Sequence, residues 1–256
     1  YYERYTAEDQ AVWKELWQRQ MKLLPGRACS EYLRALKRLP ASEDCIPNFE
    51  EVNEVLYKTS GWELVAVPGL VPDITFFTHL AAKAFPVTHW IRPRSKINYL
   101  QEPDLFHDFF GHVPMLMNPD FASYMAAYGR GGLRAVRLGD DRFLKYLARL
   151  YWYTVEFGLI EEYGEMRIYG AGIVSSPGEV VFSVENNSPN RLAFNLKRIM
   201  QTEYIINDYQ QTYWVIQSIE QLFEETKQNF KPIYYSLDGK PTYGPGEVLP
   251  TDRVYH

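Results

Sequence analysis

The sequence contains little cysteine, little histidine and no long hydrophobic run. Its 256 residues include two cysteines, Cys29 and Cys45, which excludes a disulfide framework and a cysteine-rich zinc site and indicates a reducing compartment. No stretch approaches the roughly 20 apolar residues of a membrane span, and no signal peptide is evident. We therefore expect a cytoplasmic protein with no membrane partner.

An excess of positive charge is also missing, because the net charge is −5 at pH 7. An acidic surface repels nucleic acids and anionic membranes, so neither is an expected partner. Aromatic residues, in contrast, make up 16% of the chain and include 20 tyrosines. They indicate either a tyrosine-rich core or a pocket lined by aromatic rings.

Apolar residues recur mainly at helical spacing along the chain. We expect helices after Thr6, from Ser30, after Asn48, over residues 73–84 with a stop at Pro86, after Asp120, over residues 142–159 with a cap at Asp140 or Asp141, and from about residues 191 and 208. Extended segments are expected at residues 62–69, 88–93 and 165–184, and an irregular tail at residues 231–250. No repeat or linker divides the chain. The prediction is therefore one compact, mainly helical domain with a few short β-strands over residues 1–256.

The segment HDFFGHVP, residues 107–114, holds two of the five histidines of the chain. Residues five positions apart in an α-helix point about 140° away from each other, unlike the two histidines of the zinc-protease motif HExxH, which share one helical face. A joint role for His107 and His112 requires that a helix end at Gly111 in a left-handed conformation, so that His112 folds back. Pro114 agrees with such a stop.

A third metal ligand is indicated by Glu156, which stands alone among apolar and aromatic residues in LARLYWYTVEFGLI. Burying an ionised carboxylate costs several kcal/mol unless the group is paired or bound to a metal. The simpler interpretation is a glutamate on a helix surface. Two imidazoles and one carboxylate are typical of non-haem Fe(II) oxygenases, and zinc hydrolases use the same His₂Glu set. The spacing does not choose between the two metals.

Five longer motifs resemble one family, the pterin-dependent aromatic amino acid hydroxylases, and among its members the short bacterial enzymes that act on phenylalanine. These motifs are VPGL at 67–70, HWIRP at 89–93, EPDLFHDFFGHVP at 102–114, YWYTVEFGL at 151–159 and YGAGIVSSPGE at 169–179. The resemblance implies a mainly helical catalytic domain that hydroxylates L-phenylalanine to L-tyrosine with O₂, Fe(II) and a tetrahydropterin. Asp108, Leu100 and Pro86 depart from the animal members near the cofactor.

The resemblance also implies a role for individual residues. It implies that iron binds to His107, His112 and Glu156. It implies that the pterin contacts the ring of Phe76 and the backbone of Gly69, Leu70 and Val71. It also implies that the amino acid substrate contacts Arg92, Trp152, Phe157, Ser175 and Ser176. Without the resemblance, Phe76 and Phe157 would be interpreted as core residues and Arg92 as a surface charge.

Other interpretations remain open from the residues alone. The same mechanism serves enzymes that hydroxylate tryptophan or tyrosine, and the His₂Glu set also suits a zinc hydrolase. A metal-stabilised module that binds aromatic ligands without catalysis is a third possibility. We expect a monomer, without the regulatory domain and the C-terminal tetramerisation helix of animal relatives, since prolines and glycines interrupt the sequence after Lys231.

Overall fold

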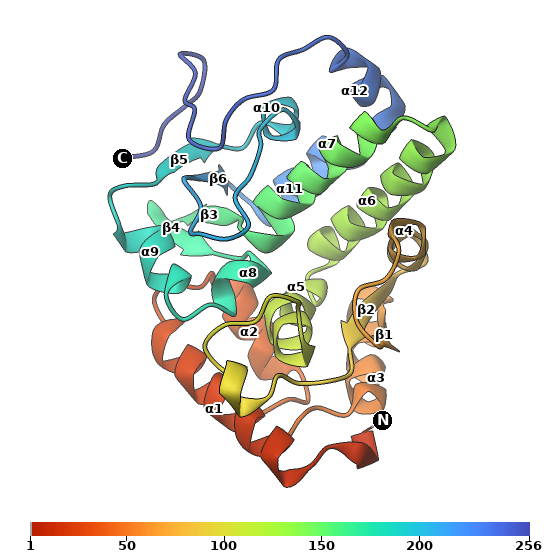
Figure 1. Cartoon of the computed structure of the whole chain (residues 1–256), viewed down its shortest axis with the longest axis vertical. Helices are drawn as coiled ribbons and strands as arrows, with labels where there is room; N and C mark the ends of the chain where they lie inside the picture. Colours follow the sequence, from red (N-terminus) through yellow and green to blue (C-terminus); the bar gives the residue numbers. More distant parts are fainter. Residues whose placement is uncertain (1) are drawn as a thin grey trace.

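The structure is a computed structural model, and it describes residues 2–256. Figure 1 shows a mainly helical molecule whose strands lie in two places, on the left and on the right of the view. The α-helices are α1 (Ala7–Leu23), α2 (Ser30–Arg38), α3 (Phe49–Ser60), α4 (Asp73–Ala81), α5 (Val113–Leu116), α6 (Pro119–Leu138), α7 (Asp141–Tyr151), α8 (Ala171–Val174), α9 (Glu179–Glu185), α10 (Leu196–Met200), α11 (Ile219–Thr226) and α12 (Phe230–Ser236). Short 3₁₀ helices cover Tyr2–Arg4 and Arg94–Lys96, and π-helices cover His107–His112 (η3) and Trp152–Glu156 (η4).

The strands form two separate sheets. In the first, β1 (Glu63–Val67) pairs in parallel with β2 (Ala84–Thr88). The second has the order β4-β3-β6-β5, formed by Glu165–Ile168, Leu159–Glu162, Thr212–Ile216 and Asn190–Ala193. Its β3 and β4 are antiparallel, whereas β6 runs parallel to both β3 and β5. The prediction of a mainly helical fold with few strands is confirmed. Among residues 2–256, no helix combines the length and apolar character that crossing a membrane requires.

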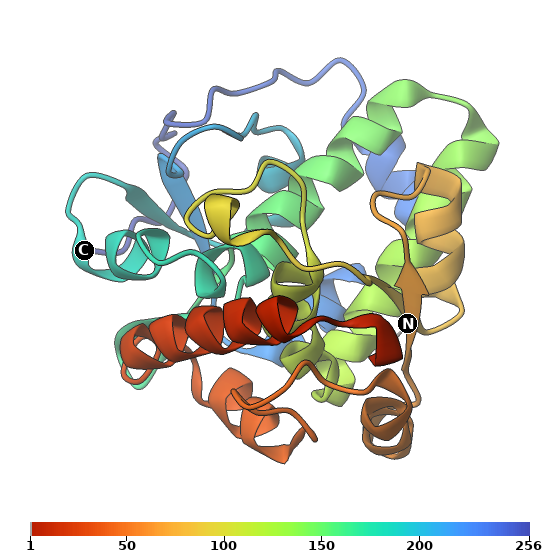
Figure 2. The same cartoon turned by 60° about the horizontal axis from the view of Figure 1, so that its bottom comes forward.

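The helices place the middle of the chain at the centre of the molecule. In Figure 1, α6 leads away from this centre and α7 returns to it as its antiparallel partner. Figure 2 shows α1 passing across the front of the segment that contains η3. The indole rings of Trp13 and Trp17 on α1 pack edge-on against Phe106 at 5.5 Å and Phe110 at 5.1 Å, measured between ring centroids. The many aromatic residues therefore build much of the core, and they hold η3 in place.

Several of the expected helix caps are present. The Thr6 hydroxyl accepts a hydrogen bond from the amide of Asp9, whose carboxylate accepts one from the Thr6 amide. Asn48 and Asp140 also cap α3 and α7, where each side chain accepts from the backbone N–H two residues further on. The cap of α6 is Asn118 rather than Asp120, because the Asn118 side chain accepts from the two amides that follow Pro119.

Several expectations about secondary structure were wrong. The helix expected to reach residue 84 ends at Ala81, and Pro86 lies inside β2, where a proline is tolerated because the strand pairs on one side. Short strands were expected over residues 165–184. Glu165–Ile168 do form a strand, β4, but Ala171–Val174 and Glu179–Glu185 form α8 and α9, and Gly178 precedes a helix rather than a strand. Where helices were expected to begin, near residues 191 and 208, the chain instead forms β5 and β6, and the helices α10 and α11 follow these strands. These strands are parallel partners far apart in sequence, so no local turn predicts them.

Candidate active site

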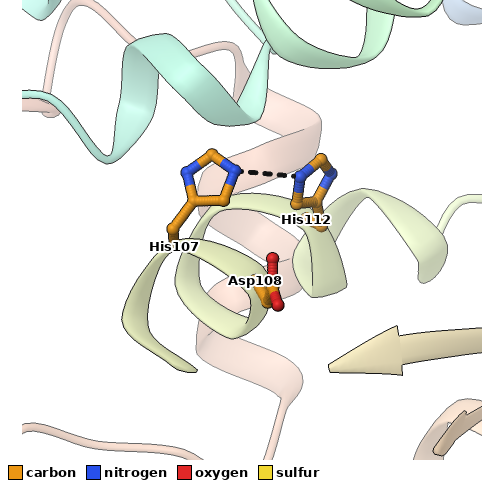
Figure 3. Close-up of side chains that lie close together, drawn as sticks. All are labelled: His107, Asp108 and His112. Carbon is orange, nitrogen blue, oxygen red and sulfur yellow. Dashed lines mark hydrogen bonds between the residues drawn. The ribbon is translucent and has the colours of Figure 1, made fainter. Parts of the chain in front are cut away.

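The two histidines share one face because η3 is a π-helix. Its backbone hydrogen bonds span five residues rather than four, so residues five apart align instead of diverging. The Nε2 atoms of His107 and His112 lie 3.2 Å apart, and Figure 3 shows the two imidazoles facing each other. The expected helix end at Gly111 was therefore wrong, because the chain continues helically into α5 with Pro114 in its first turn.

Gly111 is needed for close packing rather than for a left-handed turn. A Cβ atom at this position would lie 3.0 Å from both the Cβ and the carbonyl oxygen of Ala171. The absence of a side chain therefore lets η3 approach α8. This contact brings the loop after α8, which contains Ser175, next to His107.

Glu156 ends the second π-helix, η4, and faces the histidine pair. Its Oε1 lies 2.9 Å from Nε2 of His112, and its Oε2 lies 3.3 Å from Nε2 of His107. Ligand atoms bound at ~2.1 Å from a metal are about 3.0 Å apart at octahedral angles and about 3.4 Å apart at tetrahedral angles. The three side chains therefore fit one cation. The interpretation of Glu156 as a surface glutamate was wrong, because its side chain is only 15% exposed.

Asp108 is a second acid beside the same histidines. Ligand atoms of His107, Asp108 and His112 lie within 4.8 Å of one another, and Figure 3 shows Asp108 on the same turn. Its Oδ2, however, accepts a hydrogen bond from the Thr88 amide on β2 at 2.9 Å. Glu156 contacts both imidazoles directly, so we take Glu156 as the third candidate ligand.

The charges of the site stabilise each other. Burial alone raises the pKa of Glu156, but His112 and His107 outweigh it and hold this pKa below its usual range. Burial alone lowers the pKa of His107, but the Glu156 carboxylate raises it to about 9. Burial also raises the pKa of Asp108, and the two histidines offset part of that effect. The Glu156 carboxylate is thus negative and favours positive charge between the three side chains.

Ser175 determines which nitrogen of His107 faces the candidate metal. The Ser175 hydroxyl lies 2.8 Å from the Ala171 carbonyl oxygen and 2.9 Å from Nδ1 of His107. A hydroxyl has one hydrogen, and the carbonyl can only accept it, so the hydroxyl oxygen accepts from Nδ1–H. The neutral imidazole then carries its lone pair on Nε2, the atom that faces Glu156 and His112.

A cavity of about 240 Å³ opens beside the three candidate ligands. Its lining includes all four residues expected at the pterin, which are Gly69, Leu70, Val71 and Phe76, together with Tyr151 and Pro86. Surface hollows of about 420 and 410 Å³ elsewhere are larger, but no histidine or cysteine lines them. The cavity at the three ligands is therefore where a cofactor can meet a metal.

Arg92 is buried in an ion pair that the sequence did not predict. Its Nε and Nη2 each lie 2.9 Å from a different carboxylate oxygen of Asp104, and its Nη1 donates to the Ile97 carbonyl at 3.3 Å. Arg92 is 7% exposed and Asp104 is 0% exposed. The interpretation of Arg92 as a surface charge was wrong. The segment EPDLF holds two acids, so the sequence did not indicate Asp104 as an isolated buried carboxylate in the way that it indicated Glu156.

The other expected substrate residues surround η4 and the loop after α8. Trp152 begins η4 and Phe157 follows it, with their ring centroids 4.8 Å apart. Ser175 contacts His107, whereas the Ser176 hydroxyl accepts a hydrogen bond from the Glu179 amide. Sequence reasoning also missed Gln210, whose side chain bonds to the indole of Trp152.

Comparison with known proteins shows the family of the chain. The model of the biopterin-dependent aromatic amino acid hydroxylase family matches residues 2–238. The phenylalanine-4-hydroxylase of Ralstonia nicotianae is 55% identical over 251 residues, which cover 98% of this chain and 79% of the relative. The phenylalanine-4-hydroxylase of Chromobacterium violaceum is 54% identical over 252 residues, covering 98% and 84%.

Solved structures share the fold. The phenylalanine hydroxylase of Chromobacterium violaceum with bound oxidised Fe(III) superimposes with a TM-score of 0.95 at 53% identity, covering 99% of this chain and 91% of that one. A cobalt-bound structure of the same enzyme gives a TM-score of 0.95. The chain belongs to the biopterin-dependent aromatic amino acid hydroxylase family, and the family resemblance of its motifs is confirmed.

Proposed function

We propose that this chain is a phenylalanine 4-monooxygenase, which converts L-phenylalanine to L-tyrosine with O₂, Fe(II) and a tetrahydropterin. The observation that carries the proposal is the meeting of His107, His112 and Glu156 at one wall of the cavity that the expected pterin residues line. The relatives described above are named for phenylalanine, which favours this substrate over tryptophan and tyrosine. Family membership favours the oxygenase over the zinc hydrolase and the non-catalytic binding module.

His107, His112 and Glu156 hold the iron in this proposal. Iron and tetrahydropterin together supply the electrons that let O₂ oxidise an aromatic ring, which no side chain provides. The chain supplies position and charge. The hydrogen bond from His107 to Ser175 keeps Nε2 free for the metal, and the Glu156 carboxylate balances its positive charge.

The pterin is proposed to lie between Phe76 and the backbone of residues 69–71. Gly69 has a φ of +153°, a conformation that side chains disfavour, so glycine suits this segment. The indole N–H of Trp90 donates to the Pro68 carbonyl at 3.0 Å and fixes the start of the segment. Backbone N–H and C=O groups held in this way can recognise the polar edge of a pterin.

Arg92 is proposed to bind the carboxylate of the amino acid. A guanidinium has five N–H donors, of which Asp104 takes two and the Ile97 carbonyl takes one. The two remaining donors sit on neighbouring nitrogens and match a carboxylate. Trp152 and Phe157 are proposed to enclose the substrate ring, with Ser175 and Ser176 beside it.

Product identification tests the function directly. The protein is incubated with Fe(II), a tetrahydropterin and either phenylalanine, tyrosine or tryptophan, and the products are separated and identified. We expect tyrosine from phenylalanine at the highest kcat/KM of the three, with Zn²⁺ unable to replace Fe(II). Hydroxylation of tryptophan or tyrosine in preference to phenylalanine would reassign the substrate. Bound Zn²⁺ in the purified protein, together with no hydroxylated product from any of the three amino acids, would favour the hydrolase.

We further propose that the chain acts as a single catalytic domain, as a monomer, in the cytoplasm. Sedimentation equilibrium and a hyperbolic dependence of the rate on phenylalanine concentration test the monomer. A stable tetramer, or a sigmoidal dependence, would contradict it.

A further inference from the structure

The indole of Trp152 is held from behind by one irregular segment, residues 201–211, which joins α10 to β6. Its Nε1–H donates to Oε1 of Gln210 at 3.0 Å. The ring of Tyr204 stacks on the indole with a centroid separation of 4.5 Å and an interplanar angle of 17°. This segment therefore fixes one face and the polar edge of the Trp152 indole. The ring of Phe157, the residue after η4, also packs against the indole.

Gln210 has a single possible orientation. Its Nε2 donates to the carbonyl of Ile205 at 2.8 Å, while its Oε1 accepts from the indole. The indole N–H can only donate and the carbonyl can only accept, so the amide cannot be reversed. Gln210 is 2% exposed, so water does not replace either partner.

Glu179 connects Gln210 to the loop that contains Ser175 and Ser176. Its Oε1 accepts from the backbone N–H of Gln210 at 3.2 Å and from the Tyr213 hydroxyl at 2.6 Å, and its own backbone N–H donates to Oγ of Ser176 at 3.2 Å. Through the backbone and side chains of Glu179 and Gln210, these hydrogen bonds connect Ser176 to Trp152. These bonds link the two groups of residues that are proposed to surround the amino acid, the aromatic residues at η4 and the serines after α8.

Burial makes this arrangement energetically costly. Desolvation raises the pKa of Glu179 to about 7, although the bonds from Tyr213 and Gln210 counter it. An apolar residue of the same size would avoid this cost, because buried ionisable groups often reduce stability relative to well-packed apolar ones. A role in stability alone therefore does not account for an acid at this position.

We propose that Gln210 and Glu179 are positioning residues for the aromatic substrate, acting through Trp152 and the Ser176 loop. They fix the distance between the ring-binding and loop sides of the pocket, so that the substrate ring meets the iron in one orientation. Neither residue lines the cavity at the candidate ligands. The inference rests on the proposed phenylalanine hydroxylation.

The first test replaces Gln210 by methionine, which keeps the length of the side chain and removes the acceptor for Trp152. We expect the KM and the calorimetric Kd for phenylalanine to rise roughly 10-fold, the effect of about one lost hydrogen bond with a donor left unsatisfied. The KM for the tetrahydropterin and the bound iron should stay within about 2-fold of wild type. Gln201→Met is the matched control, since the Gln201 side chain bonds only to the exposed Pro241 carbonyl.

A double-mutant cycle distinguishes positioning from a general loss of structure. In a Trp152→Phe background the ring has no N–H to hold, so Gln210→Met should add little further change in the Kd for phenylalanine. Glu179→Met should lower the affinity for phenylalanine as Gln210→Met does. Glu179→Gln should keep most of the wild-type affinity, because the Tyr213 hydroxyl and the backbone N–H of Gln210 both donate to the one oxygen that glutamine retains.

Three results would overturn the proposal. One is an unchanged Kd for phenylalanine in Gln210→Met while the wild type makes tyrosine. Another is an increase in the Kd for phenylalanine on Gln210→Met that is as large in the Trp152→Phe background as in the wild type. The third is a wild type that binds no aromatic amino acid in calorimetry, which refutes both positioning and the substrate pocket. A wild type that binds phenylalanine but makes no tyrosine would refute only the proposed function.

Discussion

Replacing Arg92 by lysine removes a buried guanidinium that bonds to Asp104 and to the Ile97 carbonyl. In the wild type, the fork of Arg92 bonds to both oxygens of the Asp104 carboxylate at 2.9 Å. The burial of Asp104 raises its pKa, but its bonds to Arg92 outweigh that effect and lower it. A lysine offers one compact ammonium instead of a planar fork, so it cannot hold Asp104 and a substrate carboxylate bidentately at the same time.

The expected magnitudes follow from these contacts. A hydrogen bond to a charged partner contributes about 1.5 to 3 kcal/mol, and lysine forfeits one such bond to Asp104 and one to the substrate. The free energy of unfolding should therefore fall by about 1.5 to 3 kcal/mol. The KM for phenylalanine should rise roughly 10- to 100-fold. Bound iron and pterin affinity should change little.

Urea unfolding measures the first quantity and steady-state kinetics the second. Arg94→Lys is the matched control, because Arg94 is exposed and pairs with Glu8 and Glu15 outside the pocket. It should behave as wild type in both assays. If the KM for phenylalanine stays constant while pterin binding collapses, Arg92 belongs to the cofactor site and the proposed substrate clamp is wrong.

Glu156→Ala, His107→Ala and His112→Ala should each abolish hydroxylation and weaken Fe(II) binding while far-UV circular dichroism stays close to wild type, and normal turnover in any of them would remove that residue from the ligand set. Gly111→Ala should cost about 1 to 3 kcal/mol in thermal unfolding and weaken Fe(II) binding, because the added Cβ would lie 3.0 Å from the α8 backbone. A variant as stable as wild type would show that η3 and α8 can separate freely. Burial raises the pKa of Glu179 from 4.5 to about 7 in the folded chain. Between those pH values the folded chain keeps a proton that the unfolded chain has lost, so stability falls as pH rises, by roughly 3 kcal/mol in total. Denaturation of Glu179→Gln should lack this slope, and an identical slope in both proteins would disprove the assignment.

The residue types of the candidate site were predictable from the sequence. A lone glutamate in an apolar run and a pair of histidines in a chain with few of them are unusual at the level of composition alone. Such residues need partners when buried, and the structure brings Glu156, His107 and His112 together. The caps at Thr6, Asn48 and Asp140 were equally predictable, because a cap depends on residues within one turn.

The geometry of the site depends on contacts between residues far apart in the sequence. A π-helix has no composition of its own, and η3 depends on packing against the tryptophans of α1 and on the approach to α8 that Gly111 permits. The strands β5 and β6 pair with partners distant in sequence, so no local turn indicates them, although the β-branched and aromatic residues of Thr212–Ile216 favour a strand. The bond from Trp152 to Gln210 joins residues that are 58 positions apart. Contacts of this kind form only when the chain has folded, because nothing in either local sequence specifies the other.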